Sequence, residues 1–330
     1  MTDRLPAVIE VTGLKKYFPL ARRDRSRPHA QVHAVDGVSF TIGRGETLSL
    51  VGESGCGKST VGRTILGLTR PSAGEVRLDG IRIDNLSRRK LRPLRRRMQV
   101  VFQDPYSSLN PRLRVGEILA EPIANFSLAR SRAELSERIA GLLQKVRLPA
   151  DAATRFPHEF SGGQRQRIGI ARALATDPEV IICDEAVSAL DVSVKAQIVN
   201  LLADLQDDLG LSLLFITHDL AIVEHLTHRV AVMYLGRIVE AADRDSLFKK
   251  PWHPYTQALL SAVPVPDPAA SRQRMILKGD VPSPVDLPRG CRFQGRCPHV
   301  FARCRQEEPE LRVVGGAQWV ACHLEARPGE

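Results

Sequence analysis

The sequence predicts an α/β fold built on a mostly parallel β-sheet, and three observations carry that prediction. Runs that are apolar at nearly every position recur at Val180–Cys183, Leu213–Ile216 and Val230–Met233, as expected for strands buried on both faces. Between the first two runs, apolar residues at helical spacing predict a helix over 194–209, which completes a strand–helix–strand unit. A fourth apolar run, Leu48–Val51, is followed by a glycine-rich loop and another helical pattern.

Length and composition describe an ordinary globular protein. The 330 residues suggest about two domains, or one large domain with an appendage, and the chain is 43% hydrophobic and 25% charged. No apolar run approaches the ~18 residues of a membrane helix. The first residues lack a basic region followed by an apolar core, so we expect no secretory signal and a cytoplasmic protein.

The net charge of +10 is concentrated in two basic clusters, Arg22–Arg27 and Arg88–Arg97. Three interpretations stay open: a solvated face, nucleic-acid contact, or attraction to an anionic membrane leaflet. Aromatic residues make up only 5% of the chain and none interleaves with the arginines, which weakens the case for single-strand binding.

The first eighty residues predict mainly strands. Residues 8–12 alternate in polarity, and Val38–Ile42 is apolar at every other position. The basic segment Ala21–Gln31 predicts a loop, Gly43–Glu46 a turn, and Gly74–Gly80 a short strand that enters a turn.

The pattern becomes helical after residue 104. Apolar residues share one helical face at Leu135, Ile139, Leu142, Leu143 and Val146. Ser131 and Glu134 predict a capping box at the start of that helix. From Pro251 onward, prolines and four of the six cysteines predict a loop-rich tail. The predicted parts of the chain are therefore 1–103, 104–158, 159–250 and 251–330.

The glycine-rich loop Gly52–Thr60 fits the pattern G-x-x-x-x-G-K-[ST] between a strand and a helix. Its glycines allow successive amide N–H groups to point at an anion near the positive end of the next helix. We expect Lys58 to reach the β- and γ-phosphates of a nucleotide and the Ser59 hydroxyl to hold Mg²⁺. The sequence therefore predicts a nucleotide site.

A second set of residues supplies carboxylates. The apolar strand Val180–Cys183 delivers Asp184 and Glu185 at its carboxyl end, where ligands bind in open α/β sheets. We expect Asp184 to hold Mg²⁺, directly or through water. Glu185 would act as a general base on the attacking water, or would orient it.

Three further segments are individually weak. Ser161 is a natural N-cap for a helix that runs to about Thr176, and the following glycines expose N–H groups that could hold a phosphate. Gln103 follows a predicted strand, where a plain surface amide is the alternative. His218 follows another strand, where a structural histidine is the alternative.

Together these residues resemble the nucleotide-binding subunit of an ABC transporter. The shared motifs occur in the family's order over about residues 8–245: the glycine loop, Gln103, Ser161–Gln164, Asp184–Glu185, Ser188–Asp191 and His218. The resemblance implies a P-loop NTPase with a RecA-like core, an antiparallel β subdomain and a helical subdomain, to which this chain adds its small loop-rich C-terminal region.

The resemblance also implies roles for individual residues. Glu185, His218, Gln103 and Lys58 would be catalytic, and Ser59, Gln103 and Asp184 would bind Mg²⁺. An aromatic residue would stack on adenine, with Phe18 or the adjacent Tyr17 as candidates. The remaining ATP contacts would come from Gly52, Ser54, Gly55, Cys56, Gly57, Lys58, Ser59, Thr60, Ser161, Gly162, Gly163, Gln164 and Asp191. Ser161, Gly163 and Asp191 would serve the nucleotide of the opposite cassette across a dimer interface.

Three segments narrow the resemblance to the di- and oligopeptide permease subfamily: Gln103–Pro111, Phe160 in front of the signature, and His253–Thr256. The stretch Cys183–Ser188 and the cysteine-bearing tail resemble most closely its F-type ATPase subunit. Ala186 departs from the broader family, in which proline is usual after the glutamate. Because Ala186 lies beside the chemistry, we still expect an active ATPase.

The implied function is an ATP-hydrolysing subunit that drives a peptide importer at the cytoplasmic face of the inner membrane. Its implied partners are a paralogous D-type ATPase subunit in a heterodimer, two transmembrane permease subunits and an extracytoplasmic substrate-binding protein. Nickel or glutathione import is an alternative. An ABC-type ATPase acting on nucleic acid is a weaker one, because a single cassette with a short insert differs from those proteins.

The tail cysteines form the pattern Cys291-x5-Cys297-x6-Cys304-x17-Cys322. A cytosolic chain should not keep structural disulfides, and the gaps are wider than those of most zinc sites. A [4Fe-4S] cluster, which the resemblance also implies, is the leading interpretation, with zinc and free thiols as alternatives. Cys56 and Cys183 are expected to be small packing residues.

Overall fold

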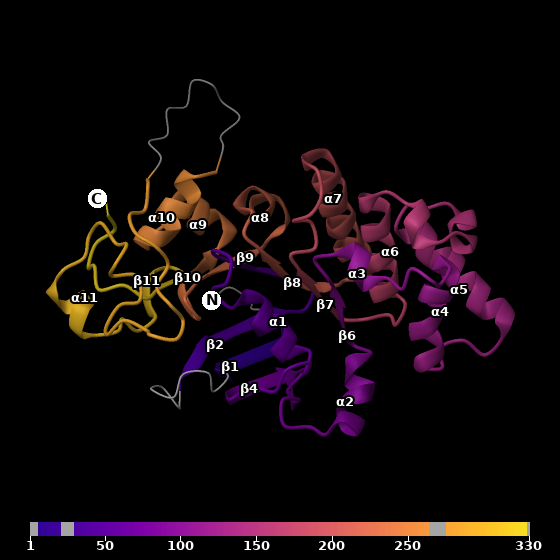
Figure 1. Ribbon diagram of the computed structural model, residues 1–330, viewed down its shortest axis with the longest axis horizontal. Coiled ribbons are helices and arrows are strands. Elements are labelled where there is room, and N and C mark those ends of the chain that lie inside the picture. Colours follow the sequence, from indigo (N-terminus) through magenta and orange to yellow (C-terminus); the bar gives the residue numbers. More distant parts are fainter. Residues whose placement is uncertain (1–5, 21–29, 264–274, 329–330) are drawn as a thin grey trace. The chain divides into compact units, whose positions relative to one another are not determined.

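The computed structural model describes residues 6–20, 30–263 and 275–328 (Figure 1). The chain divides into two compact units, and each is described by itself. Unit 1 comprises the start of the chain to Val8, Ile42–Thr47 and Asn85–Thr217, and unit 2 comprises Ile9–Thr41, Leu48–Asp84 and His218–Glu330. The basic cluster Arg22–Arg27 lies outside the described residues.

Three parallel strands form the sheet of unit 1. They are β6 (Met98–Val101), β7 (Val180–Asp184) and β8 (Ser212–Thr217), in the spatial order β8–β7–β6. Every residue of β7 and β8 is buried. Burial on both faces explains why these strands are apolar along their length, and it confirms the strands predicted at these positions.

Helices make up most of the remainder of unit 1. They are α2 (Arg88–Arg95), α3 (Pro105–Ser108), α4 (Val115–Asn125), α5 (Arg132–Lys145), α6 (Gly162–Leu174) and α7 (Val192–Leu209), with 3₁₀ turns at Ala150–Thr154 and Pro157–Glu159. Helices α4, α5 and α6 pack together (Figure 1). Helix α7 confirms the helix predicted over 194–209 and ends at Gly210, whose φ of 62° suits a glycine C-cap.

The capping box predicted for α5 is half right. The Ser131 hydroxyl accepts a hydrogen bond from the Glu134 N–H at 3.1 Å, as predicted. The Glu134 carboxylate instead accepts from the N–H of Arg130 at 2.7 Å, one residue earlier than a capping box requires. Glu134 therefore binds the backbone N–H of Arg130, the residue before the N-cap, rather than the N–H of the N-cap residue Ser131.

Unit 2 holds two sets of strands. They are β1 (Ala7–Pro19), β2 (Gln31–Gly43), β3 (Thr47–Val51), β4 (Ala73–Leu78), β5 (Ile81–Arg82), β9 (Arg229–Tyr234), β10 (Arg237–Asp243), β11 (Arg312–Gly315) and β12 (Gln318–Val320). One set has the order β2–β1–β4–β5, with antiparallel β1–β4 and β4–β5 pairs. The other has the order β11–β12–β10–β9–β3, in which only β3 and β9 are parallel.

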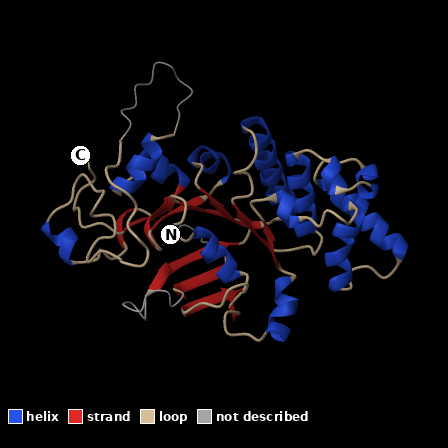
Figure 2. Cartoon of the chain, viewed as in Figure 1, coloured by secondary structure: helices blue, strands red, loops and turns tan. Residues whose placement is uncertain are grey.

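The C-terminal tail is anchored to the core of unit 2. The helices of this unit are α1 (Lys58–Ile65), α8 (Leu220–Leu226), α9 (Arg244–Lys249), α10 (Pro254–Ser261) and α11 (Ala302–Gln306). Figure 2 shows the tail mostly as loop, as predicted, although strands β11 and β12 were not predicted. The Phe293 ring lies 5.3 Å from that of Tyr234 and 5.5 Å from that of Tyr255 between centroids. These contacts leave the Phe293 side chain 1% exposed.

None of the helices in the described residues combines the length and the apolar character that crossing a membrane requires.

Candidate nucleotide site

The predicted phosphate-binding loop Gly52–Thr60 connects β3 to α1 in unit 2. Gly52 has φ +151° and Gly57 has φ +106°, conformations that favour glycine. A Cβ on Gly52 would lie 2.1 Å from the Met233 carbonyl oxygen, and a Cβ on Gly57 would lie 1.9 Å from that of Ala34. The loop therefore packs against β9 and β2 at distances that only glycine permits.

Lys58 is held inside this loop. Its side chain is buried, with 3% of the residue exposed, and Nζ donates to the carbonyl oxygens of Gly52 at 2.7 Å and Glu53 at 2.9 Å. Ser59 and Thr60 follow it in the first turn of α1, where the positive end of the helix favours an anion. The Lys58 ammonium group, the amino-terminal end of α1 and the amide groups of the loop thus lie close together.

The two cysteines outside the tail are packing residues, as predicted. Cys56 lies in the loop and Cys183 on β7, and both are buried free thiols. Burial raises the pKa of Cys56, and it raises that of Cys183 to about 12. Both thiols are therefore neutral near pH 7 and poor nucleophiles.

The two candidate adenine-stacking residues lie side by side on β1 but differ in environment. The Tyr17 hydroxyl donates to Asp36 at 2.5 Å, and its ring lies 4.4 Å from that of His33. Burial, with the adjacent Asp36 carboxylate, raises the pKa of Tyr17 to about 12. Phe18 is 38% exposed, with the Lys16 ammonium 4.8 Å from its ring centroid. Phe18 is the more accessible of the two rings.

Sequence reasoning missed two residues that act on the loop, Tyr255 and Arg296. The Glu53 N–H donates to the Tyr255 hydroxyl at 2.8 Å, and the Glu53 carboxylate accepts two hydrogen bonds from Arg296 at 2.7 and 3.0 Å. Tyr255 belongs to the His253–Thr256 segment on which the subfamily resemblance was based. Arg296, which is 243 residues from Glu53, carried no local signal.

In unit 1 the predicted carboxylates and Gln103 lie at the same edge of the sheet. Asp184 is the last residue of β7 and is 7% exposed. Val101 on β6 pairs with Cys183 on β7, so Gln103 and Glu185 each stand two residues beyond a matched pair. Because the strands are parallel, their carboxyl ends place these polar groups at the same edge of the sheet.

Glu185 has a strained backbone. Its φ of 50° lies in the left-handed region, which is uncommon for residues other than glycine. Its N–H donates to the Ile216 carbonyl at 2.9 Å, and its carbonyl accepts from the Ser188 hydroxyl at 2.9 Å and from the Ser188 N–H at 3.0 Å. Strain of this kind, held by surrounding hydrogen bonds, is concentrated at functional sites.

The signature residues Ser161–Gln164 begin α6 with a complete capping box. The Ser161 hydroxyl accepts from the Gln164 N–H at 3.4 Å, and the Gln164 side-chain oxygen accepts from the Ser161 N–H at 3.0 Å. Gly163 is buried, and a Cβ there would lie 2.4 Å from Cγ1 of Val194 on α7. Asp191 is the exposed N-cap residue of α7. Both segments are thus exposed helix starts, apart from the buried glycine.

The candidate residues are divided between the units. Gly52–Thr60, Tyr17, Phe18 and the exposed His218 belong to unit 2. Gln103, Ser161–Gln164, Asp184, Glu185 and Asp191 belong to unit 1. The phosphate loop therefore lies in unit 2, and the carboxylate edge of the sheet lies in unit 1.

The four tail cysteines are free thiols that are buried or half-buried. Burial raises the pKa of Cys291 to about 12 and that of Cys297 to about 11, and the other tail sulfurs add to both shifts. The Cys291 N–H donates to the Cys304 carbonyl at 2.8 Å. Within the described part of the chain, no three His, Cys, Asp or Glu side chains are arranged to hold a metal ion.

Comparison with known proteins places these features in a family. Residues 35–188 match the model of the ABC transporter family, and residues 239–304 match that of the oligopeptide/dipeptide transporter C-terminal region. A probable peptide ABC transporter ATP-binding protein of Sinorhizobium fredii is 55% identical over 97% of this chain and 90% of its own. The chain belongs to the ATP-binding subunits of ABC transporters. The resemblance identified from its motifs is confirmed.

Other members of the family agree. The oligopeptide transport ATP-binding protein AppF of Bacillus subtilis is 50% identical over 96% of this chain and 97% of its own. A dimeric post-hydrolysis structure of the ATP-binding cassette MJ0796 with ADP and phosphate matches with a TM-score of 0.64. It is 30% identical and covers 72% of this chain and 98% of its own. The predicted cassette fold and ATPase activity are therefore established, and this family uses ATP with Mg²⁺.

Proposed function

We propose that the chain is the ATP-hydrolysing subunit of a di- or oligopeptide importer. The observation that carries the proposal is the nearly full-length similarity to relatives named for peptide transport, including a tail that matches the peptide-transporter C-terminal region. A cassette match alone would indicate only an ABC ATPase. The tail is the part that points to the peptide branch.

The chain's own residues suggest how the site works. Phosphoryl transfer depends mainly on positioning and charge stabilisation. Lys58 and the loop amides would neutralise the phosphates, while Ser59, Asp184 and Gln103 would hold Mg²⁺, which supplies further charge neutralisation. Glu185 would orient and deprotonate the attacking water, and His218 would complete the site.

The nucleotide site would be completed by a second cassette. Ser161, Gly162, Gly163, Gln164 and Asp191 would contact the nucleotide bound by that partner. This assignment is supported by the exposure of the polar residues of this group at the starts of α6 and α7. Phe18 or Tyr17 would stack on adenine, with the exposure of Phe18 favouring it. We therefore expect the isolated chain to be a poor ATPase.

The partners would be those of a peptide importer. We propose a paralogous D-type cassette as the dimer partner, two transmembrane permease subunits and an extracytoplasmic substrate-binding protein. The exposed Gln103 would contact a permease subunit, which would place the chain at the cytoplasmic face of the membrane. Co-purification of the complex from detergent-solubilised membranes, followed by mass spectrometry, would identify each partner.

The test of the hydrolytic role is Glu185→Gln in the assembled complex. We expect this variant to bind ATP normally and to lose steady-state turnover, because the amide retains the size of the side chain but cannot accept the proton of water. Glu179→Gln is a matched control, since Glu179 pairs with Arg97 and Arg44 away from the predicted site. Normal ATPase activity of Glu185→Gln would refute the assignment.

The nucleic-acid alternative is not favoured. The relatives are named for transport, and part of the basic cluster around α2 is used within unit 1. Arg97 pairs with Glu179 at 2.5 Å, and Arg96 donates to the Thr176 carbonyl at 3.2 Å. Nickel and glutathione remain alternative cargoes, which transport assays with the assembled complex would distinguish.

For the tail, we propose that Cys291, Cys297, Cys304 and Cys322 hold a [4Fe-4S] cluster, with zinc as the alternative. The donor set suits either group, because all four cysteines are free thiols in a loop-rich segment. No three potential ligands among the described residues are arranged to hold a metal ion, so binding of the cluster or of zinc would have to bring the four sulfur atoms closer together. An anaerobic absorption spectrum with iron and zinc analysis is the test. Absence of both metals would leave free thiols.

A further inference from the structure

The turn between the first two tail cysteines is fixed against the core of unit 2. Within it, the Cys297 N–H and the Arg296 N–H each donate to the Phe293 carbonyl at 3.0 Å, and the Gln294 N–H donates to the Cys291 carbonyl at 3.1 Å. The Phe293 side chain is 1% exposed and lies among the aromatic rings of the core. This turn therefore holds its side chains in defined directions.

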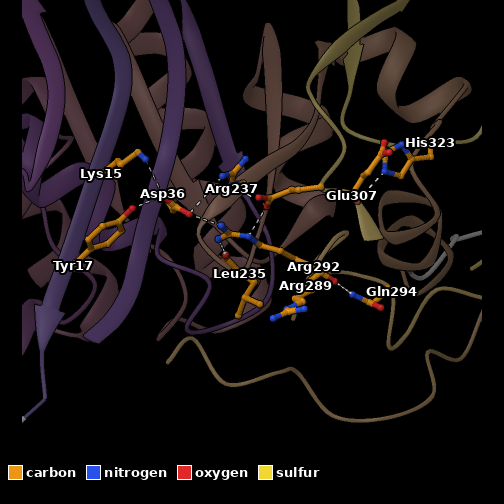
Figure 3. A network of polar contacts seen from close by, with 11 residues as sticks. Lys15, Tyr17, Asp36, Leu235, Arg237, Arg289, Arg292, Gln294, Glu307 and His323 are labelled. Carbon is orange, nitrogen blue, oxygen red and sulfur yellow. Dashed lines mark hydrogen bonds and ion pairs between the residues drawn. The ribbon is translucent and has the colours of Figure 1, made fainter. Parts of the chain in front are cut away.

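Two arginines leave this turn in the direction of the predicted nucleotide site. Arg296 pairs with Glu53 through two hydrogen bonds of 2.7 and 3.0 Å, and its side chain is 10% exposed. Arg292 is 7% exposed and donates to the Leu235 carbonyl at 2.7 Å and to the Asp36 carboxylate (Figure 3). Asp36 in turn accepts from Tyr17, one of the two candidate adenine-stacking residues.

The contact with Glu53 bears directly on the phosphate loop. Glu53 immediately follows Gly52, and the carbonyl oxygens of these two residues accept the hydrogen bonds of Lys58 Nζ. The Glu53 side chain is fixed by Arg296, and its N–H is fixed by the Tyr255 hydroxyl at 2.8 Å. The side chain and the N–H of Glu53, beside the two carbonyl groups that hold Lys58, are thus both bound by residues of the C-terminal third of the chain.

We propose that Arg296 is a positioning residue for nucleotide binding, which holds the phosphate loop in its binding geometry through Glu53. The inference rests on the proposed ATP site. A bidentate pair between guanidinium and carboxylate is geometrically specific. With Arg296 10% and Glu53 29% exposed, water screens the pair less than it would screen one on the open surface. Fixing the loop before the nucleotide arrives lowers the ordering cost of binding. The peptide-transporter tail therefore forms part of the nucleotide site of its own cassette.

The test is the affinity of the full chain for Mg²⁺–ATPγS, measured by titration calorimetry. We expect Arg296→Gln to weaken binding about tenfold, which corresponds to about 1.4 kcal/mol. Glu53→Gln should match it, and the double variant should be no weaker than either single one, because all three lack the same pair. Arg296→Lys, which keeps the charge but not the fork, should lie between wild type and Arg296→Gln.

Arg303→Gln is the matched control. Arg303 is also a tail arginine in an ion pair, at 2.8 Å from Glu307, but that pair is exposed and makes no contact with the loop. We expect wild-type affinity from this variant. Equal affinity of Arg296→Gln and wild type, or additive losses in the double variant, would overturn the inference. Failure of the wild-type chain itself to bind would instead remove the proposed site on which the inference rests.

Discussion

Gly57→Ala should destabilise the protein more than Gly55→Ala, which substitutes another glycine of the same phosphate loop. Gly57 is the N-cap residue of α1, with φ +106°, which an L side chain rarely adopts. The new Cβ would also lie 1.9 Å from the Ala34 carbonyl oxygen and 3.0 Å from the terminal methyl of Met233. Backbone strain and a backbone clash therefore act together.

The magnitude can be separated by comparison with Gly55→Ala. Gly55 also has positive φ, at +81°, but a Cβ there would meet no atom within 4 Å. Strain alone should reduce the free energy of unfolding by about 1–2 kcal/mol in that control. Relief of the Gly57 contact requires the loop or β2 to shift by more than 1 Å, so we expect a total loss of about 3–5 kcal/mol.

Urea denaturation of the two variants and wild type, without nucleotide, measures this difference directly. Omitting nucleotide matters because a Cβ at Gly55 could also touch a bound phosphate, which would mix two effects. Equal free energies of unfolding for Gly57→Ala and Gly55→Ala would refute the reasoning, since the clash would then contribute nothing. An increased denaturant slope in Gly57→Ala alone would instead point to a change in the unfolded ensemble.

Three other predictions concern single side chains. Tyr255→Phe should cost about 1–3 kcal/mol in urea denaturation, because the Glu53 N–H loses its acceptor. Burial raises the pKa of Asp36, but hydrogen bonds from Tyr17 and Arg292 outweigh burial, so the net effect of folding is to lower that pKa. The stability that Asp36 adds is therefore complete above its pKa in the unfolded chain, about 3.9, and is lost as the pH falls through its lower pKa in the folded chain. The free energy of unfolding of wild type should therefore exceed that of Asp36→Asn at pH 7, and the gap should narrow below about pH 4. Glu185→Gly should have a free energy of unfolding in urea about 1 kcal/mol higher than that of Glu185→Ala, because glycine adopts a φ of 50° without the strain that alanine has there. Both variants should lack ATPase activity.

The strands and loop at the centre of the cassette were predictable because their signals are local. Each strand of the buried β7–β8 pair must be apolar on both faces, so a short run of residues is enough to identify it. The tail strands differ. In β11 three of four residues are exposed, and β12 joins the sheet only by pairing with β10, where Val320 stands opposite Glu240. A strand pair whose partners are 80 residues apart produces little signal in the local sequence.

The same distinction separates the predicted catalytic residues from the residues that hold them in place. Lys58 and Glu185 were predicted from their positions in local motifs, because a nucleotide site would need particular groups at the ends of strands. Arg296 is one arginine among many, and its partner Glu53 is an unspecified position of the loop motif. A long-range ion pair of this kind is visible only after folding, since neither residue type constrains its neighbours.

The backbone of Glu185 connects these two kinds of information. A motif predicts only that a carboxylate is needed at this position, and it says nothing about the main-chain conformation that presents it. The structure adds a left-handed φ, held by hydrogen bonds to Ile216 on the neighbouring strand and to Ser188. An L residue pays a strain of about 1–3 kcal/mol there, which glycine would largely avoid. Retention of glutamate at a position that suits glycine is therefore an argument for its function that does not depend on the motif.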